Sequence, residues 1–279
     1  MVFYQICFGQ YCKNKYAEAE NLIQGYLATI LRNGQINRNY SIMSWNGEVV
    51  AYINAYGYDA NCLKSHCHFG KEKLRQLKAF FGQPPVWRHN EDFPVKRKTN
   101  WKDAPFLYLA TDLFDSCSPL TRGDDGMIIP LYRVPISDMD REAVVSWQWK
   151  YQAFDEVWID SCELEMKAYR VIAEPESKLS KKGRELCLAI EKATGVPTYY
   201  YLKRYYGRDD TDEKRRRCPL CGKPWHVKRH EKQTVEDTSF GDFAFQCVKC
   251  RLVSHIAPII NLRNAKIGEP KKGFSKQEL

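Results

Sequence analysis

The chain has 279 residues, of which 44% are hydrophobic and 28% charged, and its formal net charge is +9. These proportions exclude collagen-like, coiled-coil and wholly disordered proteins, and the length allows one large domain or two modest ones. No apolar run approaches the roughly 20 residues of a membrane-spanning helix, and the first residues lack the basic lead and apolar run of a secretory signal. We therefore expect a cytoplasmic protein with no membrane partner.

The N-terminal part reads as alternating strands and helices. Residues 2–8 are apolar and β-prone and predict a strand, and apolar side chains at helical spacing over residues 16–31 predict an amphipathic helix. Strand-like runs at residues 40–45 and 49–56 flank Asn46-Gly47, a strong hairpin signal. A second helix is expected over residues 71–81, ended by Gly82. Residues 84–135 alternate prolines with short apolar runs and predict irregular strands and long loops.

A helical segment is expected at about residues 137–195. Aromatic side chains recur at helical spacing from Trp147 to Trp158, Pro175 interrupts the pattern, and Gly195 ends it. Residues 198–206 form a β-prone aromatic run that predicts a strand with one buried face. Tyrosine beside Lys and Arg is also typical of base-stacking platforms, so that alternative stays open for this run.

Two pairs of cysteines in C-x-x-C spacing form the strongest motif. The pairs are Cys218 with Cys221 and Cys247 with Cys250, and 25 residues separate them. In each pair the two thiolates of a tight turn can face one ion, and four thiolates complete the tetrahedron of a structural Zn²⁺ site. A module of about this size usually needs a metal or disulfides to fold. We therefore predict one structural zinc ion bound by these four cysteines.

Histidines near cysteines suggest two other sites, which we do not favour. His226 and His230 have the spacing of zinc-finger histidines, but four cysteines already complete the tetrahedron, so both are expected to face solvent. A second cluster lies within seven residues of the N-terminal part and consists of Cys62, His66, Cys67 and His68. Its spacing matches no common metal site, and we expect these residues to begin a helix.

The predicted fold class is α+β, with a mixed α/β N-terminal domain followed by a small C-terminal zinc ribbon. The composition shifts at about Tyr206, where a basic run follows a short polar stretch. We place the α+β domain at residues 1–206, with the helical segment inside it, and the zinc-ribbon domain at residues 207–267. Residues 268–279 lack periodicity and are expected to form a loose basic tail.

The positive charge concentrates around the predicted ribbon. Residues 214–262 hold ten Lys and Arg against four Asp and Glu, a surplus of +6, which leaves +3 for the rest of the chain. Basic side chains beside aromatic rings can bind single strands through phosphate attraction and base stacking. The candidate nucleic-acid contacts are Lys214, Arg215, Arg216, Arg217, Lys223, Trp225, Lys228, Arg229 and Lys232. Alternatively, Trp225 packs the strands of the ribbon and residues 214–217 are a solvated linker.

Several segments resemble a known bacterial family. They are residues 197–202 (PTYYYL), 205–207 (YYG), 218–225 (CPLCGKPW) and 245–254 (FQCVKCRLVS), together with the helical stretch of residues 147–191. The sequence is similar to zinc-ribbon-containing proteins of unknown function for which nucleic-acid binding has been suggested. The resemblance carries the ribbon cysteines over to Cys218, Cys221, Cys247 and Cys250, and it implies no catalytic residues.

Two functions remain as hypotheses. The first is a non-catalytic zinc-ribbon protein whose basic ribbon contacts nucleic acid with little sequence selectivity. The second is a protein-interaction module, such as an adaptor or an immunity-type protein, that uses the ribbon as a rigid scaffold. We find no catalytic constellation, phosphate-binding loop or nucleophile motif, so we expect neither an enzyme nor a small-molecule substrate. A third and weaker hypothesis is an enzyme whose site lies in the Pro-rich middle, which a deep polar pocket near Asp112–Asp125 would support.

Overall fold

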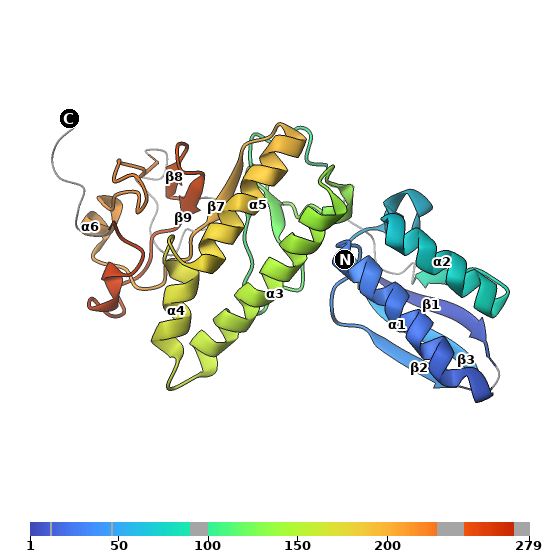
Figure 1. Ribbon diagram of the computed structural model, residues 1–279. Helices are drawn as coiled ribbons and strands as arrows, with labels where there is room; N and C mark the ends of the chain where they lie inside the picture. Colours follow the sequence, from blue (N-terminus) through green and yellow to red (C-terminus); the bar gives the residue numbers. More distant parts are fainter. Residues whose placement is uncertain (12, 46, 90–99, 228–242, 271–279) are drawn as a thin grey trace. The chain divides into compact units, whose positions relative to one another are not determined.

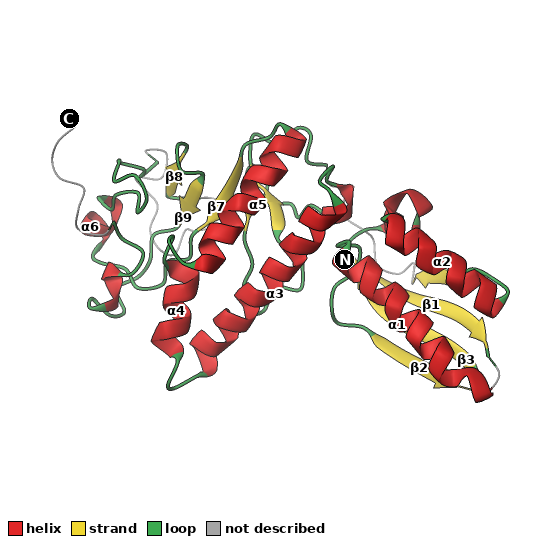
Figure 2. Ribbon diagram, viewed as in Figure 1, coloured by secondary structure: helices red, strands yellow, loops and turns green. Residues whose placement is uncertain are grey.

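The computed structural model describes residues 1–270 except for residues 12, 46, 90–99 and 228–242. The chain divides into two compact units. The first comprises Met1–Asn100, Ser116–Ser118 and Ile128–Ser146, and the second Trp101–Asp115, Pro119–Met127 and Trp147–Leu279. Both contain helices and a sheet, so the predicted mixed α and β fold class is confirmed (Figures 1 and 2). No helix in the described ranges is long and apolar enough to cross a bilayer.

The first unit is a four-stranded antiparallel sheet with two helices on one face (Figure 2). Its element order is β-α-β-β-α-β and its strand order is β2-β3-β1-β4, the ferredoxin-like arrangement. The strands are β1 (Val2–Gln10), β2 (Ser41–Trp45), β3 (Glu48–Ala55) and β4 (Val86–His89), and the helices are α1 (Tyr16–Arg32) and α2 (His68–Phe81). The predicted strand, helix, hairpin and second helix all lie at the expected places.

Alternating side chains explain why this sheet buries one face. Tyr4, Ile6 and Phe8 of β1 lie in the core with the apolar stripe of α1, which includes Ile23 and Leu27. Side chains of successive strand residues point to opposite faces, so the residues between them point away from both helices. The apolar periodicity of the sequence therefore decides which face of the sheet the helices cover.

The second unit has a five-stranded sheet in the order β6-β5-β7-β9-β8. The three central strands are parallel and the two edge strands are antiparallel to their neighbours. The strands are β5 (Leu107–Leu109), β6 (Leu120–Arg122), β7 (Thr198–Tyr201), β8 (Phe245–Cys247) and β9 (Leu252–Ser254). Between β5 and β7 the chain forms α3 (Asp138–Asp160), α4 (Glu165–Ala173) and α5 (Lys178–Thr194).

Helix α5 packs closely on β7 because Gly183 lacks a side chain. A Cβ atom at Gly183 would lie 2.2 Å from the ring of Tyr200. The helix begins at its N-cap Ser177, whose hydroxyl accepts a hydrogen bond from the backbone of Ser180, and it ends at Gly195 with φ of 73°. The predicted glycine stop is therefore confirmed. The strand expected over residues 198–206 is shorter than predicted, because β7 ends at Tyr201, and Thr198, Tyr199 and Tyr200 are buried on both of its faces.

The predicted ribbon does not stand apart from this sheet. Strand β9 pairs in parallel with β7, with Tyr200 opposite Leu252 and Tyr201 opposite Val253. The boundary expected after Tyr206 therefore lies inside the second unit, because the hairpin of β8 and β9 supplies two of the five strands of the sheet. The amino-acid composition shifts near Tyr206, but the residues before and after it belong to one sheet because β7 pairs with β9.

Candidate metal centre

The two C-x-x-C pairs come together at the end of the second unit. The four Sγ atoms of Cys218, Cys221, Cys247 and Cys250 all lie within 4.8 Å of one another, and those of Cys221 and Cys247 are 3.7 Å apart. A tetrahedral ion with metal–sulfur bonds of about 2.3 Å holds its sulfurs about 3.8 Å apart. The cluster could therefore hold one metal ion, as the spacing predicts.

Each pair lies in a turn whose backbone folds back toward its sulfurs. In the first, the backbone N–H of Gly222 donates to the carbonyl of Cys218 at 2.9 Å, and Gly222 has a φ of 67°. In the second, the residue after the last cysteine is Arg251, which has a φ of 50° and is the only non-glycine residue of the described chain with positive φ. The residue after each cysteine pair is thus left-handed, although only the first is the glycine that favours this conformation.

The four cysteines need a nearby cation if all of them are to be thiolates. Burial raises the pKa of the Cys218 thiol to about 12 and also raises that of Cys250. For Cys221, burial acts in the same direction, but hydrogen bonds from the Lys223 backbone and the neighbouring thiols lower the pKa overall. Four thiolates crowded together would repel one another, and a divalent ion offsets this repulsion. The donor set is the one that Zn²⁺ prefers, and four protein ligands leave no open position.

An ion pair fastens the second cysteine turn to α5. The guanidinium of Arg251 donates to both carboxylate oxygens of Glu191, at 2.9 and 2.7 Å, and to the carbonyl of Val248 at 3.0 Å. Hydrogen bonds from Arg251 hold the pKa of Glu191 below its ordinary value. Sequence patterning singled out neither residue. The position of Arg251 directly after the last cysteine was the available signal.

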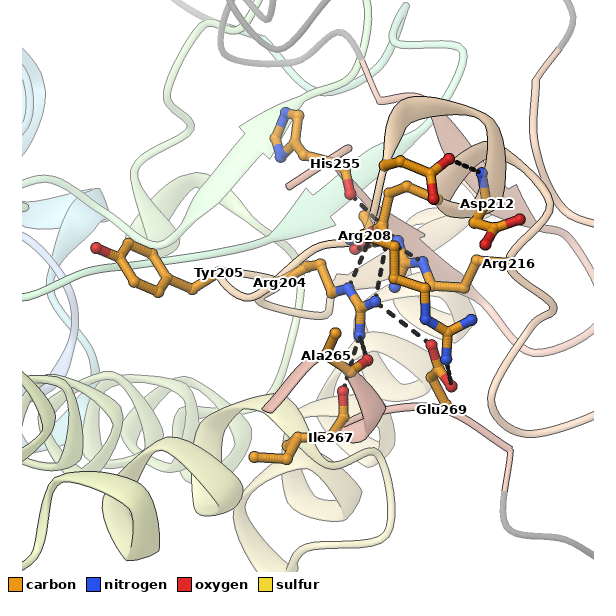
Figure 3. Close-up of polar contacts among 12 residues, drawn as sticks. Arg204, Tyr205, Arg208, Asp212, Arg216, His255, Ala265, Ile267 and Glu269 are labelled. Carbon is orange, nitrogen blue, oxygen red and sulfur yellow. Dashed lines mark hydrogen bonds and ion pairs between the residues drawn. The ribbon is translucent and has the colours of Figure 1, made fainter. Parts of the chain in front are cut away.

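Within the basic run of residues 214–217, the side chain of Arg216 points into the protein interior. This side chain is buried, and its guanidinium lies 4.2 Å from the centre of the Phe245 ring and 4.9 Å from that of Trp225. It donates to Ser254 Oγ at 3.2 Å and to the carbonyl of His255 at 3.1 Å (Figure 3). Burial lowers the pKa of Arg216 to about 9, which leaves it charged at neutral pH. Arg216 is therefore not available to phosphate, contrary to the prediction.

A buried carboxylate compensates the charges around Arg216. Glu213 lies in the short helix α6 (Asp210–Lys214) and is fully buried. It accepts two hydrogen bonds from Arg204, both 2.9 Å long, and pairs with Arg216 at 3.4 Å. Arg204 also donates to the carbonyls of Ala265 and Ile267 (Figure 3). Sequence patterning missed this network because Arg204 and Glu213 look like ordinary surface charges.

The same network corrects the prediction that a loose tail begins at residue 268. Glu269 forms ion pairs with Arg204 and Arg208, and a Cβ at Gly268 would lie 2.7 Å from the carbonyl oxygen of Ala173. The first residues assigned to the tail are therefore packed, because the buried Arg204 and the partly exposed Arg208 both hold Glu269. Residues 271–279 lie outside the described residues.

Trp225 is not placed to stack on a base. Its side chain is 3% exposed and packs on Phe245, with ring centres 5.2 Å apart. This is the packing role that the sequence left open, and it replaces the predicted stacking role. Phe243 and Phe245 are also buried. The described part of the ribbon, residues 214–227 and 243–262, therefore offers no exposed aromatic ring.

The remaining residues predicted to meet nucleic acid differ in how far their charge is neutralised. Lys214 pairs with Asp210 at 2.7 Å, and Arg215 lies 4.0 Å from Asp212. Arg217 and Lys223 are exposed. The other three predicted residues, Lys228, Arg229 and Lys232, lie outside the described residues.

Histidines outside the four-cysteine cluster have other roles. His226 is not in that group, and it forms a β-bridge with Phe245. His230 lies outside the described residues. In the first unit, His66 is buried, with one ring nitrogen 2.9 Å from the Tyr26 hydroxyl and the other 2.9 Å from the carbonyl of Cys62.

Cys67, the residue after His66, caps the N-terminus of α2. The sulfur of Cys67 accepts a hydrogen bond from the backbone of Gly70 and so caps the start of α2. Cys67 and His68 therefore begin a helix as expected, whereas Cys62 and His66 lie before it, at the two ends of the 3-10 helix Leu63–Ser65. Among the described residues, the four-cysteine cluster is the only group of metal-ligating side chains close enough to share an ion.

The fold and the cluster define a mixed α/β protein with a C-terminal four-cysteine site. Two domains of unknown function match the chain: DUF2310 over residues 102–203 and DUF8594 over residues 207–259. An uncharacterized protein of Haemophilus influenzae is 39% identical over 171 residues, which is 60% of this chain and 79% of the relative. A second uncharacterized protein of that organism is 39% identical over 168 residues, and the chain spans 61% of its length.

The chain therefore belongs to the family of these Haemophilus influenzae proteins, a family of unknown function. No solved structure matches the chain. A function must accordingly be inferred from the site itself.

Replacing Cys250 with serine tests the metal centre. A serine hydroxyl does not ionise as a thiol does, so Cys250→Ser leaves three sulfur ligands. We expect one metal ion per chain in the parent protein and a loss of most of the bound metal in the variant, measured by elemental analysis of the purified protein. The control is Cys162→Ser at an exposed cysteine outside the cluster. Equal metal content in both variants would contradict the assignment of Cys250 as a ligand.

Replacing Glu213 with glutamine tests the buried ion network. The change leaves two buried guanidinium groups without their shared carboxylate, and breaking a buried pair in this way costs about 3–5 kcal/mol. We expect a loss of that size in the free energy of unfolding, measured by urea denaturation. Glu185→Gln, at an exposed residue of α5, should change stability by less than about 0.5 kcal/mol. Similar losses in the two variants would show that the network contributes little.

Proposed function

We propose that the protein is a non-catalytic binding protein in which one structural Zn²⁺ ion organises a ribbon. Cys218, Cys221, Cys247 and Cys250 would be its ligands, and the closed set of four sulfurs supports a structural rather than a catalytic ion. Binding of the ion would stabilise the folded state, and the chain provides the four sulfur ligands and the two turns that orient them. Cysteines that bind a metal must stay reduced, and a reducing compartment such as the expected cytoplasm keeps them so.

We further propose that the ribbon contacts nucleic acid through phosphates. The observation that supports this most is the charge of the segment around the cysteines, where residues 214–262 hold ten Lys and Arg against four Asp and Glu. Arg217, Lys223 and Lys249 are exposed, and none of them pairs with an acid of the described chain. Lys223 and Lys249 each lie within two residues of a proposed zinc ligand, so the ion would fix the loops that carry them.

The interaction would be electrostatic and weakly selective. Lysine binds phosphate as a point charge, and contacts to phosphate carry no information about base sequence. Because Trp225 is buried, the described ribbon adds no stacking to this attraction. Binding should therefore weaken steeply as salt rises.

A protein partner is the second candidate, and an exposed apolar segment favours it. Ile259, Ile260 and Leu262 follow β9, and their exposed fractions are 58%, 50% and 62%. Three large apolar side chains exposed within four residues are typical of an interaction surface. On this hypothesis the ribbon holds the segment for another protein.

Salt titration of the full-length protein tests nucleic-acid binding. We expect a short fluorescent oligouridylate to bind at low salt, with an affinity that falls linearly in log–log form as salt rises. The Lys223→Ala, Lys249→Ala double variant should lower the slope by about 0.7 for each phosphate of the single strand that it no longer neutralises. The control is Lys182→Ala, an exposed lysine on α5 that pairs with Glu185.

Absence of detectable binding to RNA or DNA at low salt would contradict the nucleic-acid proposal. A protein partner that persists in affinity purification after nuclease treatment, and that no longer binds the Ile259→Ser, Ile260→Ser variant, would favour the second candidate. Neither outcome bears on the metal, which elemental analysis tests separately.

A further inference from the structure

The sheet of the first unit has one face that neither helix covers. The direction of its side chains follows from the strand register, because residues directly opposite each other in antiparallel strands point to the same face. Gln5 of β1 lies opposite Tyr52 of β3 and Arg88 of β4. We call this the open face of the first unit, and the residues used below are Phe3, Gln5, Tyr52, Asn54 and Arg88.

Two aromatic rings lie on the two inner strands of the open face. Phe3 and Tyr52 belong to the two inner strands of the sheet, and their rings are stacked, with centres 6.0 Å apart and planes 11° apart. Phe3 is 48% exposed, whereas its chain neighbours Val2 and Tyr4 are buried in the core. An exposed phenylalanine on an inner strand is costly in water, so this pair calls for an explanation beyond packing.

Hydrogen-bonding side chains surround the two rings. Phe3 lies opposite Asn54, and Tyr52 lies opposite Gln5, so an amide stands beside each ring across the strand pair. Amides can donate to and accept from base edges and ribose hydroxyls. The guanidinium of Arg88 is on the same face and exposed, and it forms no ion pair with a described acid.

The charge of this unit suits an anionic partner. Residues 1–89, which contain all four strands, hold ten Lys and Arg against five Asp and Glu, a surplus of +5. A second basic region therefore lies outside the ribbon. A polyanion would be attracted to the unit as a whole, and flat rings with amides at the open face would meet its bases.

We propose that the open face binds single-stranded RNA, with bases stacked on Phe3 and Tyr52 and with Gln5, Asn54 and Arg88 around them. A four-stranded sheet with aromatic rings on its inner strands is one of the structures that proteins use to stack two or three RNA bases. This inference rests on the proposed nucleic-acid function and adds to it the surface that reads bases. The described ribbon lacks such a surface, because its rings are buried.

Variants of the full-length protein test the proposal by their affinity for a fluorescent oligouridylate. Phe3→Leu and Tyr52→Leu keep apolar side chains but remove the aromatic faces. Each should weaken binding about tenfold or more, since stacking on one ring contributes about that much to affinity. Phe3→Tyr keeps a ring and should retain most of the affinity. Phe69→Leu removes a ring that is 65% exposed on α2, away from the open face, and should have no effect.

Three further measurements separate the outcomes. Circular dichroism should show that the leucine variants are folded, and a photo-cross-linking oligouridylate should attach to peptides of β1 or β3. The oligodeoxynucleotide of the same sequence should bind more weakly, because the amides lose the ribose hydroxyls.

Several results would overturn the proposal. If the leucine variants bind normally while Lys223→Ala, Lys249→Ala loses affinity, the open face is not the RNA site and the ribbon proposal stands. If the parent protein binds neither RNA nor DNA, both proposals fail, and if it binds DNA but no RNA, only the open-face proposal fails. Equal or tighter binding of the DNA strand would overturn the assignment to RNA. A change of oligomeric state in the leucine variants, with RNA affinity unchanged, would show that a second copy of the chain covers the face.

Discussion

The proposed binding of one ion by the four sulfurs is the interaction on which our account of the second unit depends. The strands β8 and β9 lie beside the cysteine turns, and β9 is at the same time the neighbour of β7 in the sheet. A hairpin of two three-residue strands is too small to be stable alone in water. The sulfur cluster closes it at one end, and Glu191 holds it to α5 through Arg251. The proposed zinc ion therefore does more than fold a separate module: it secures an edge of a larger sheet.

The positive charge of the C-terminal part serves two different purposes. Arg204 and Arg216 point inward, where Glu213 and the rings of Trp225 and Phe245 compensate them. Arg217, Lys223 and Lys249 remain outside and can meet an anion. A count of charges along the sequence cannot separate these groups, because a buried arginine and an exposed one contribute equally to it. The acidic residues of α6, which are Asp210, Asp212 and Glu213, further reduce the surplus of positive charge.

The sequence predicted the local features well. Helices α1, α2 and α5, the β2–β3 hairpin and the sulfur cluster follow from periodicity, glycine stops and C-x-x-C spacing, all of which act over a few residues. The errors concern interactions between distant segments. Trp225 and Arg216 are buried because β8 and β9 return to them, and Glu269 is held by Arg204, 65 residues earlier. The pairing of β7 with β9 has no local signature, so the second unit could not be seen as one sheet.

Hydrogen exchange of the intact protein with and without its metal tests the central role of the sulfur cluster most directly. After chelation, confirmed by elemental analysis, amides of β8, β9 and the adjoining β7 should exchange much faster, while those of β1 and β3 in the first unit should keep their protection. Unchanged protection of β8 and β9 in metal-free protein, or the finding that the purified protein never held an ion, would contradict that role.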